Sequence, residues 1–289
     1  MSVSTPPSLP SRPAARLRPA RRLLTRAAVI GAAATLCATA TSTSAQAIVH
    51  GKDSTEAYPF MVSIPMVLED DQNPLDGVCG GTLVAPRWVL TAGHCAQEEG
   101  VMGAHPVGTV RIGSEDRSSG GTVRKVVEKV VHPGYDASSP YRSRSDIALL
   151  RLDRPAPQQP IRMADRAPRV GAPTRVLGFG TVVDGKQPQD WVFAERLQEL
   201  DTRRAAAAKC LDIDGKSELC TTSRVRGAMA CSGDSGGPQI QRVHGRWQLV
   251  GATSGDGDHA VNPLCGGGPG IYTSVPAHKA WIGKTLAGR

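Results

Sequence analysis

Short apolar stretches separated by turn-forming residues fill the chain from Ile48 onward. Many of them contain Val, Ile or Thr, and Gly, Pro, Asn or Asp recur between them. Short runs of this kind with frequent turn signals predict antiparallel β-structure. The clearest predicted strands lie at residues 60–64, 82–84, 88–90, 147–150, 174–177 and 248–250. The pattern therefore predicts an all-β fold.

Three segments after Ile48 depart from this pattern. Asp201–Leu211 contains a run of alanines and predicts a helix. Pro276–Leu286 predicts a short C-terminal helix, which Trp281 and Ile282 would dock on the sheet. Leu68–Asp76 is acidic and rich in turn residues, and we interpret it as a solvated loop, with a cation site as the alternative.

The first 47 residues have a different composition. Six arginines and no acidic residue are found there, and an Ala-rich apolar run extends from Ala27 to Ala40. The stretch ends in Ala45-Gln46-Ala47, and this arrangement is typical of a secretory signal peptide. The apolar run is shorter than the roughly 20 residues that span a bilayer. We expect residues 1–47 to be removed and the mature protein to be extracellular, with twin-arginine export left open by Arg21-Arg22.

Loss of the signal changes what the charge and the cysteines imply. The formal net charge of +8 falls to +2 without the six arginines, so we expect neither nucleic-acid binding nor membrane binding by the mature chain. Six of the seven cysteines remain, and an even number in an exported chain predicts three disulfides. No CxxC pair is present, so a zinc site is not expected, and spacing alone leaves all fifteen pairings open.

Three residues lie in contexts that suit nucleophilic catalysis. His94 follows a short apolar run in TAGHC, Asp146 enters a buried strand in SDIALLRL, and Ser235 lies in GDSGGP. A serine hydroxyl needs a base to remove its proton, and that base needs an orienting partner. Taken singly, each residue also fits an ordinary turn, cap or surface position. Their joint presence in the order His, Asp, Ser favours the catalytic interpretation.

The chain resembles the chymotrypsin/trypsin-like serine proteases, in particular the secreted bacterial trypsin-like enzymes. The motifs are IVHG at Ile48, CGGTLVAPRWVLTAGHC at Cys79, SDIALLRL at Ser145, CSGDSGGP at Cys231 and PGIYTSV at Pro269. Their order argues against subtilisin-like and α/β-hydrolase scaffolds. The resemblance implies two packed antiparallel β-barrels, chymotrypsin-like, spanning residues 48–160 and 161–289, with the active site between them. It also implies an enzyme that needs no cofactor and acts on proteins or peptides. We assign no metal ligands, and a structural calcium in the first barrel is left open. We expect a monomer, with protein inhibitors as further partners.

The resemblance assigns a role to each matching residue. His94 would be the general base and acid, Asp146 its orienting carboxylate, and Ser235 the nucleophile that forms an acyl-enzyme. The N–H groups of Gly233 and Ser235 would form the oxyanion hole, and Ser254 would support Asp146. The implied disulfides are Cys79–Cys95, Cys210–Cys220 and Cys231–Cys265.

A buried ion pair between a free N-terminus and Asp234 is also implied. Ile48 would be that terminus, and Ala47 at the predicted signal cleavage site precedes it. We therefore expect export itself to expose Ile48, without a zymogen stage. An earlier cut, after Ala40 for instance, would leave a short propeptide instead.

The sequence departs from the family at the primary specificity pocket. Trypsin-like enzymes carry an aspartate six residues before the nucleophile, where this chain has Met229. A thioether cannot pair with Lys or Arg and suits apolar groups, so Met229, with Ala230 and Gly270, predicts an apolar pocket. Ser254-Gly255-Asp256 replaces the family's Ser-Trp-Gly. The chain then inserts GDHAVNPL, residues 257–264, before Cys265, and we interpret this insertion as a solvated loop. The alternative is that Asp256 or Asp258 supplies a negative charge to the pocket.

The favoured function is a secreted serine endopeptidase. A protease-like binding protein with a damaged site is one alternative, and retention of His94, Asp146 and Ser235 argues against it. An esterase that uses the same three residues is another, and activity on esters without activity on peptides would favour it.

Overall fold

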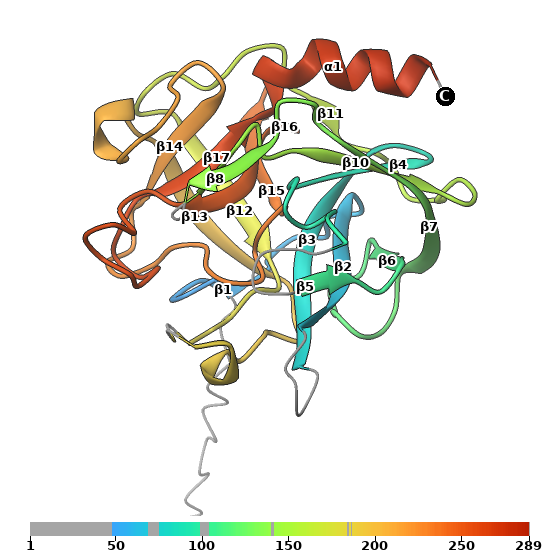
Figure 1. Cartoon of the computed structure of the whole chain (residues 1–289), viewed down its shortest axis with the longest axis horizontal. Helices are drawn as coiled ribbons and strands as arrows, with labels where there is room; N and C mark the ends of the chain where they lie inside the picture. The colour runs from blue at the N-terminus through green and yellow to red at the C-terminus, as the bar shows by residue number, and fades with distance from the viewer. Residues whose placement is uncertain are drawn as a thin grey trace, which may run out of the picture. The chain divides into compact units, whose positions relative to one another are not determined.

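The computed structural model describes residues 48–288, apart from 69–74, 99–103, 140–141, 184 and 186. Antiparallel strands make up most of the regular structure, as the sequence predicted (Figure 1). The expected strands at residues 60–64, 82–84, 88–90, 147–150, 174–177 and 248–250 all overlap observed strands. The signal peptide lies outside the described residues, as does most of the loop expected at Leu68–Asp76.

Six strands close into the first barrel. Their order is β3-β4-β10-β7-β6-β2, and β2 pairs again with β3, while β5 adds to β2. The six are β2 (Met61–Leu68), β3 (Leu75–Ala85), β4 (Trp88–Thr91), β6 (Thr109–Ile112), β7 (Thr122–Val131) and β10 (Ala148–Leu152), and the added strand β5 spans Ala104–Pro106. A separate hairpin, β8 (Asp136–Ser139) and β9 (Arg142–Arg144), precedes β10.

Six further strands close into the second barrel. Their order is β13-β12-β15-β16-β17-β14, and β14 pairs again with β13. These strands are β12 (Pro173–Gly178), β13 (Gln198–Arg204), β14 (Glu218–Ser223), β15 (Pro238–Val243), β16 (Arg246–Asp256) and β17 (Gly270–Ser274). Two short strands add to this sheet: β1 (Lys52–Asp53) pairs with β13, and β11 (Arg162–Met163) pairs with β16. Closure of both sheets confirms the chymotrypsin-like fold class. The division between domains at residue 160 stays a prediction.

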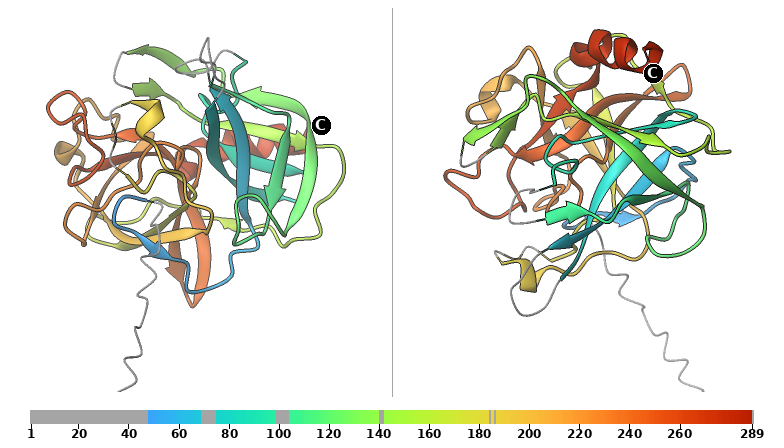
Figure 2. Two further views of the ribbon diagram at one scale, coloured as in Figure 1. Left: turned by 90° about the horizontal axis from the view of Figure 1, so that it is seen from below. Right: turned by 45° about the vertical axis from the view of Figure 1, so that its right-hand side comes forward.

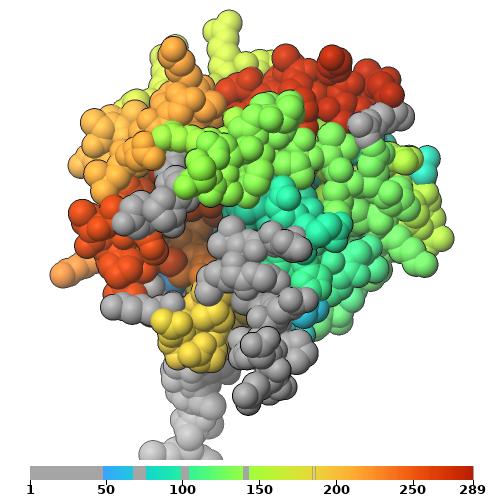
Figure 3. Space-filling view, viewed as in Figure 1, coloured from blue at the N-terminus to red at the C-terminus, as the bar shows by residue number. Residues whose placement is uncertain are grey.

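Each barrel packs apolar side chains inside. Leu83, Leu90 and Leu149 are fully buried in the first barrel, and Val176 and Val250 are fully buried in the second. Burial of such side chains is the main favourable term in folding, at about 25 cal/mol per Å² of apolar surface. In Figure 3 the first barrel lies on the right in cyan and green, the second lies on the left in orange and red, and the surface is hollowed between them.

The helix predicted at Asp201–Leu211 is wrong. Residues up to Arg204 belong to β13, and within the predicted segment only Ala207–Lys209 forms a short 3₁₀ helix. A second short 3₁₀ helix in the described chain spans Pro188–Asp190. Within β13, Thr202 and Arg204 are buried while Asp201 and Arg203 are exposed, which is the two-residue period of a strand. Pairing with strands on both sides therefore overrides the helix propensity of the alanines that follow.

The predicted C-terminal helix is confirmed. Helix α1 spans Val275–Ala287, and the Ser274 side chain caps it by accepting a hydrogen bond from the Ala277 N–H. Ile282 is fully buried and Trp281 packs against the same core, as the sequence suggested. Figure 2 shows α1 at the C-terminal end of the chain, outside both barrels.

Candidate active site

His94 is held at the end of a buried strand of the first barrel. All four residues of β4 are buried, and the turn after β4 leads directly to His94 and Cys95. A disulfide between Cys95 and Cys79 fixes this turn to β3. The imidazole Nδ1 lies 2.8 Å from Asp146 Oδ2, and the His94 N–H donates to Asp146 Oδ1 at 2.9 Å. Because a carboxylate only accepts, Nδ1 donates and Nε2 keeps its lone pair.

Asp146 receives hydrogen bonds from both barrels. It lies just before β10 and is 1% exposed. Ser254, on β16, donates from Oγ to Asp146 Oδ2 at 2.6 Å, and Thr273, on β17, donates from Oγ1 to the Asp146 carbonyl oxygen at 2.8 Å. The second barrel therefore fixes the carboxylate that orients His94.

These contacts shift the pKa of both members of the pair. Burial alone would lower the pKa of His94, but the charge of Asp146 and its hydrogen bond outweigh burial and raise it above 6.5. Burial would likewise raise the pKa of Asp146, but His94 and the Ser254 hydrogen bond outweigh burial and lower it. Asp146 is thus an ionised partner for His94 at neutral pH.

The Ser235 loop reaches across to the first barrel. The Ser235 carbonyl oxygen accepts a hydrogen bond from the Gly80 N–H at 2.7 Å and lies 3.6 Å from Cys95 Sγ. A Cβ on Gly80 would come within 2.6 Å of the Gly237 Cα, so the close approach of β3 to the Ser235 loop requires glycine there. The disulfide that follows His94 is therefore in contact with the backbone of Ser235.

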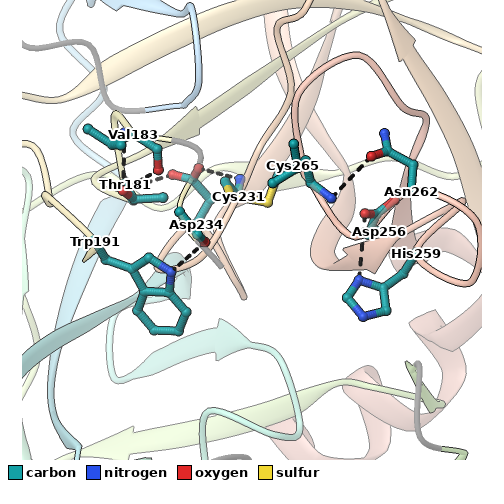
Figure 4. The surroundings of a disulfide bond; sticks show 12 residues. Thr181, Val183, Trp191, Cys231, Asp234, Asp256, His259, Asn262 and Cys265 are labelled. Atoms are coloured by element: carbon teal, nitrogen blue, oxygen red, sulfur yellow. Dashed lines mark hydrogen bonds and ion pairs between the residues drawn. A yellow bond between two sulfur atoms is a disulfide. The ribbon is translucent and has the colours of Figure 1, made fainter. Parts of the chain in front are cut away.

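Gly233 and Asp234 shape the turn before Ser235. Gly233 has φ +88°, and a Cβ there would come within 2.6 Å of the Phe193 ring, so only glycine fits. Asp234 is fully buried, and its carboxylate accepts a hydrogen bond from the backbone N–H of Gly180 at 2.8 Å. It accepts a second one from the backbone N–H of Cys231 at 2.9 Å (Figure 4).

Burial dominates the titration of Asp234. It raises the pKa of the Asp234 carboxyl to about 7, although the two backbone hydrogen bonds oppose the shift. Within the described part of the chain, no cationic side chain forms an ion pair with Asp234. This buried carboxyl lacks the positive charge that would keep it ionised.

Met229 is buried beside Gly270 and Tyr272. Met229 is only 2% exposed. The Tyr272 hydroxyl donates a hydrogen bond to its Sδ at 3.7 Å. A Cβ on Gly270 would lie 3.1 Å from the same sulfur. Burial and the nearby charge of Asp234 raise the pKa of the Tyr272 hydroxyl, so that hydroxyl stays neutral. Ala230 is partly buried next to Met229.

Asp256 pairs in register with Gly270, and its carboxylate contacts residues of its own loop. Its Oδ1 accepts a hydrogen bond from the Asp258 N–H at 2.9 Å, and its Oδ2 lies 3.9 Å from His259 Nδ1. Figure 4 shows Asp256 facing His259, with the Cys231–Cys265 disulfide between this pair and Asp234 in the view. The disulfides are Cys79–Cys95, Cys210–Cys220 and Cys231–Cys265, the pairs that the resemblance implies.

Sequence reasoning overlooked two contacts of the site. Thr273 and Tyr272 lie within the PGIYTSV motif, but nothing in the sequence indicates that Thr273 bonds the Asp146 backbone or that Tyr272 bonds Met229. The alternation along β17 offered the only signal, because it predicts that neighbours point to opposite faces.

Metal ligation finds little support in this site. Within the described residues, one group of potential ligands comes together, Cys79, His94 and Cys95, and its two sulfurs are joined in a disulfide. A disulfide offers no thiolate, so this group does not fit a zinc site. Among the same residues, no helix has both the length and the apolar character needed to cross a bilayer.

Comparison with known proteins places this site in a family. The sequence model of the Trypsin family matches residues 48–282. Kallikrein-8 of Mus musculus is 33% identical over 223 residues, which cover 73% of this chain and 78% of the relative. Trypsin of Sarcophaga bullata is 33% identical over 250 residues, which cover 82% of this chain and 88% of the relative.

A solved structure agrees with these relatives. Neuropsin, a serine protease expressed in mouse brain, superposes with a TM-score of 0.65 at 29% identity, covering 83% of this chain and all of the neuropsin chain. These relatives are animal proteins, so they do not support the narrower likeness to bacterial enzymes. The matched region contains the two closed barrels and the His94–Asp146 pair. The chain belongs to the trypsin family of serine proteases and is a serine endopeptidase.

Proposed function

We propose that His94, Asp146 and Ser235 form the catalytic triad of this enzyme. The observation that carries the proposal is the His94–Asp146 pair next to the loop of Ser235, in which Asp146 is buried and accepts a hydrogen bond from Ser254. His94 Nε2 would take the Ser235 proton during attack on the peptide carbonyl, and then return it to the leaving amine. Asp146 would stabilise the imidazolium that forms in between.

The Gly233 and Ser235 N–H groups would bind the oxyanion that develops during attack. The positive φ of Gly233 and the buried carboxylate of Asp234 support this, because both fix the direction of the backbone in the turn. Donors held in place before reaction cost no reorganisation when the charge develops.

The N-terminal segment supports cleavage between Ala47 and Ile48. Ile48 is fully buried in the second barrel, and the Met229 N–H donates to the Val49 carbonyl oxygen at 3.2 Å. Ile48 has φ +60°, a strained value for a β-branched residue. Hydrolysis of the preceding peptide bond removes that dihedral angle and creates an ammonium group. We propose that this group pairs with Asp234 and lowers its pKa from about 7.

Secreted, active protein is therefore expected to begin at Ile48. A form that keeps Ala47 would leave Asp234 without the ion pair that fixes the turn of Gly233 and Ser235. We expect its activity to be about 10² lower, since loss of one well-placed oxyanion donor costs about that much in kcat. N-terminal sequencing of secreted material and assay of both forms would test this. Ile48→Val, which keeps the ammonium group, is the control. Full activity in protein that starts before Ile48 contradicts the expectation.

An apolar primary pocket follows from the surroundings of Met229. The side chain carries no charge, and the Asp256 carboxylate is engaged within its own loop. A Lys or Arg side chain would thus enter without a counter-ion, which is costly. We propose preference for medium-sized apolar residues before the scissile bond, because Met229 occupies the space beside Gly270.

Peptides that differ only at that residue test the proposed specificity. The wild type is expected to cut fastest after Leu, Met, Phe or Tyr. Met229→Asp is expected to raise kcat/KM for Arg relative to Leu by about 10²-fold, since it supplies the missing counter-ion. Met229→Leu keeps the pocket apolar and is the matched control. Wild-type cutting that is fastest after Arg or Lys would show that another acid, from the Asp256–Asp258 loop, serves the pocket.

The proposal includes export and an extracellular place of action. The composition of residues 1–47 and the three disulfides of the described chain support it, because disulfides persist in oxidising compartments.

A further inference from the structure

A second hollow lies on the second barrel, next to the segment that carries Met229. It encloses about 590 Å³ and is lined by residues 222–228, residues 267–269 and Lys209. The catalytic residues do not line it. Its walls come from the end of β14 and from the segment before β17.

The charge of this hollow is one-sided. Lys209, Arg224 and Arg226 line it, all three are exposed, and no acidic residue is among the lining residues. Arg203 is exposed on the neighbouring strand and pairs in register with Thr222 of the lining. We call these four cations and the hollow between them the basic pocket.

The four cations of the basic pocket have no internal counter-ions. Among the described residues, no carboxylate forms an ion pair with any of them. Asp258 packs against Gly268 of the lining, but it forms no ion pair with these cations. Since the mature chain has a formal charge near +2, this local excess is not a general property of the surface. A bound anion would relieve the repulsion between the four charges.

We propose that the basic pocket binds an acidic segment of the polypeptide substrate outside the active site. The enzyme is an endopeptidase, so polypeptides are what it meets, and carboxylates complement Lys and Arg. The size of the hollow also favours several side chains over one small anion. The proposal rests on the endopeptidase activity, and it assigns this surface to substrate recognition.

The position of the basic pocket links it to the specificity pocket proposed above. Gly227 and Ala228 of its wall lead directly to Met229, and Pro269 leads directly to Gly270. An acidic segment bound here would lie next to the two chain segments that carry Met229 and Gly270. Such anchoring adds binding to ground state and transition state alike, so it lowers KM and leaves kcat unchanged.

Binding to catalytically inactive protein tests the proposal without use of the activity. The probe is a fluorescein-labelled octaglutamate peptide, titrated by anisotropy with the Ser235→Ala mature chain at low salt and at 0.5 M salt. The pocket variant is Arg224→Glu/Arg226→Glu. The control is Arg154→Glu/Arg166→Glu, which makes the same change in net charge at two exposed arginines outside the basic pocket.

Binding to the parent protein is expected, with affinity about tenfold lower in the pocket variant and less than about twofold lower in the control. High salt is expected to weaken binding, because exposed charges are screened. Equal loss in both variants would show a response to net charge alone and overturn the proposal. Absence of binding at low salt would overturn the proposal too. Equal displacement of the probe by inorganic phosphate and by unlabelled octaglutamate at the same concentration would indicate a small-anion site, and it would also overturn the proposal. Because the parent protein and both variants carry Ser235→Ala, the binding result does not depend on whether the assignment of the triad holds.

Discussion

Ser235→Ala is expected to lower kcat for peptide hydrolysis by about 10⁶-fold, because the acyl-enzyme can no longer form. KM is expected to change little, since the hydroxyl contributes little to substrate binding. The assay is cleavage of a peptide with Leu before the scissile bond, with a background low enough to follow the residual rate. Ser232→Ala, in the same loop, is the matched control and should stay within a few-fold of wild type. A loss of less than tenfold in Ser235→Ala contradicts the assignment of the nucleophile.

The effects of His94→Ala and Ser235→Ala on kcat are expected not to add. His94→Ala alone should cost about as much as Ser235→Ala, because the base and the nucleophile act as one unit. The double variant should therefore be no slower than either single variant. Losses that add in the double variant would indicate that the two side chains act in separate steps.

Asp146→Asn is expected to lower kcat by about 10⁴-fold. The Asn amide can donate a hydrogen bond to Nδ1 of His94, which favours the tautomer with its proton on Nε2. In that tautomer Nε2 has no lone pair with which to accept the Ser235 proton. The buried position of Asp146 and its hydrogen bonds to His94 and Ser254 make this effect large. Asp136→Asn, at an exposed carboxylate of β8, is the control and should leave the rate unchanged.

The pH profile separates this role from a structural one. The proposed mechanism needs neutral His94, and the Asp146 charge raises the pKa of His94 above 6.5 against the effect of burial. The wild-type kcat/KM should therefore rise with pH through a midpoint above 6.5. Without the Asp146 charge, burial dominates and the midpoint should move to lower pH in Asp146→Asn. An unshifted midpoint together with a large loss of rate would indicate disruption of the fold.

The fold could be predicted largely from local patterns. Strands such as β4 and β10 are short apolar runs between turn signals, and tertiary structure preserves that preference. The helix prediction for residues 201–211 was wrong because it used only the local helix propensity, while β13 is stabilised by pairing with two strands distant in the sequence. The prediction of the C-terminal helix was confirmed because no strand pairs with these residues.

The site was less accessible to sequence reasoning. His94, Asp146 and Ser235 stood out by their motifs, but the support of Asp146 comes from residues more than a hundred positions away, Ser254 and Thr273. Contacts at such separation depend on closure of the second barrel, which no local pattern encodes. The absence of a charge at Met229 could be predicted, whereas its contact with Tyr272 could not.

Covalent labelling tests the central claim most directly. Mature protein would be treated with diisopropyl fluorophosphate, digested, and analysed by mass spectrometry for the modified serine. We predict one adduct, on Ser235, that forms more slowly as pH falls and His94 is protonated, and that is nearly absent in His94→Ala. An adduct on a different serine, or none in protein that begins at Ile48, would contradict Ser235 as the nucleophile of this enzyme.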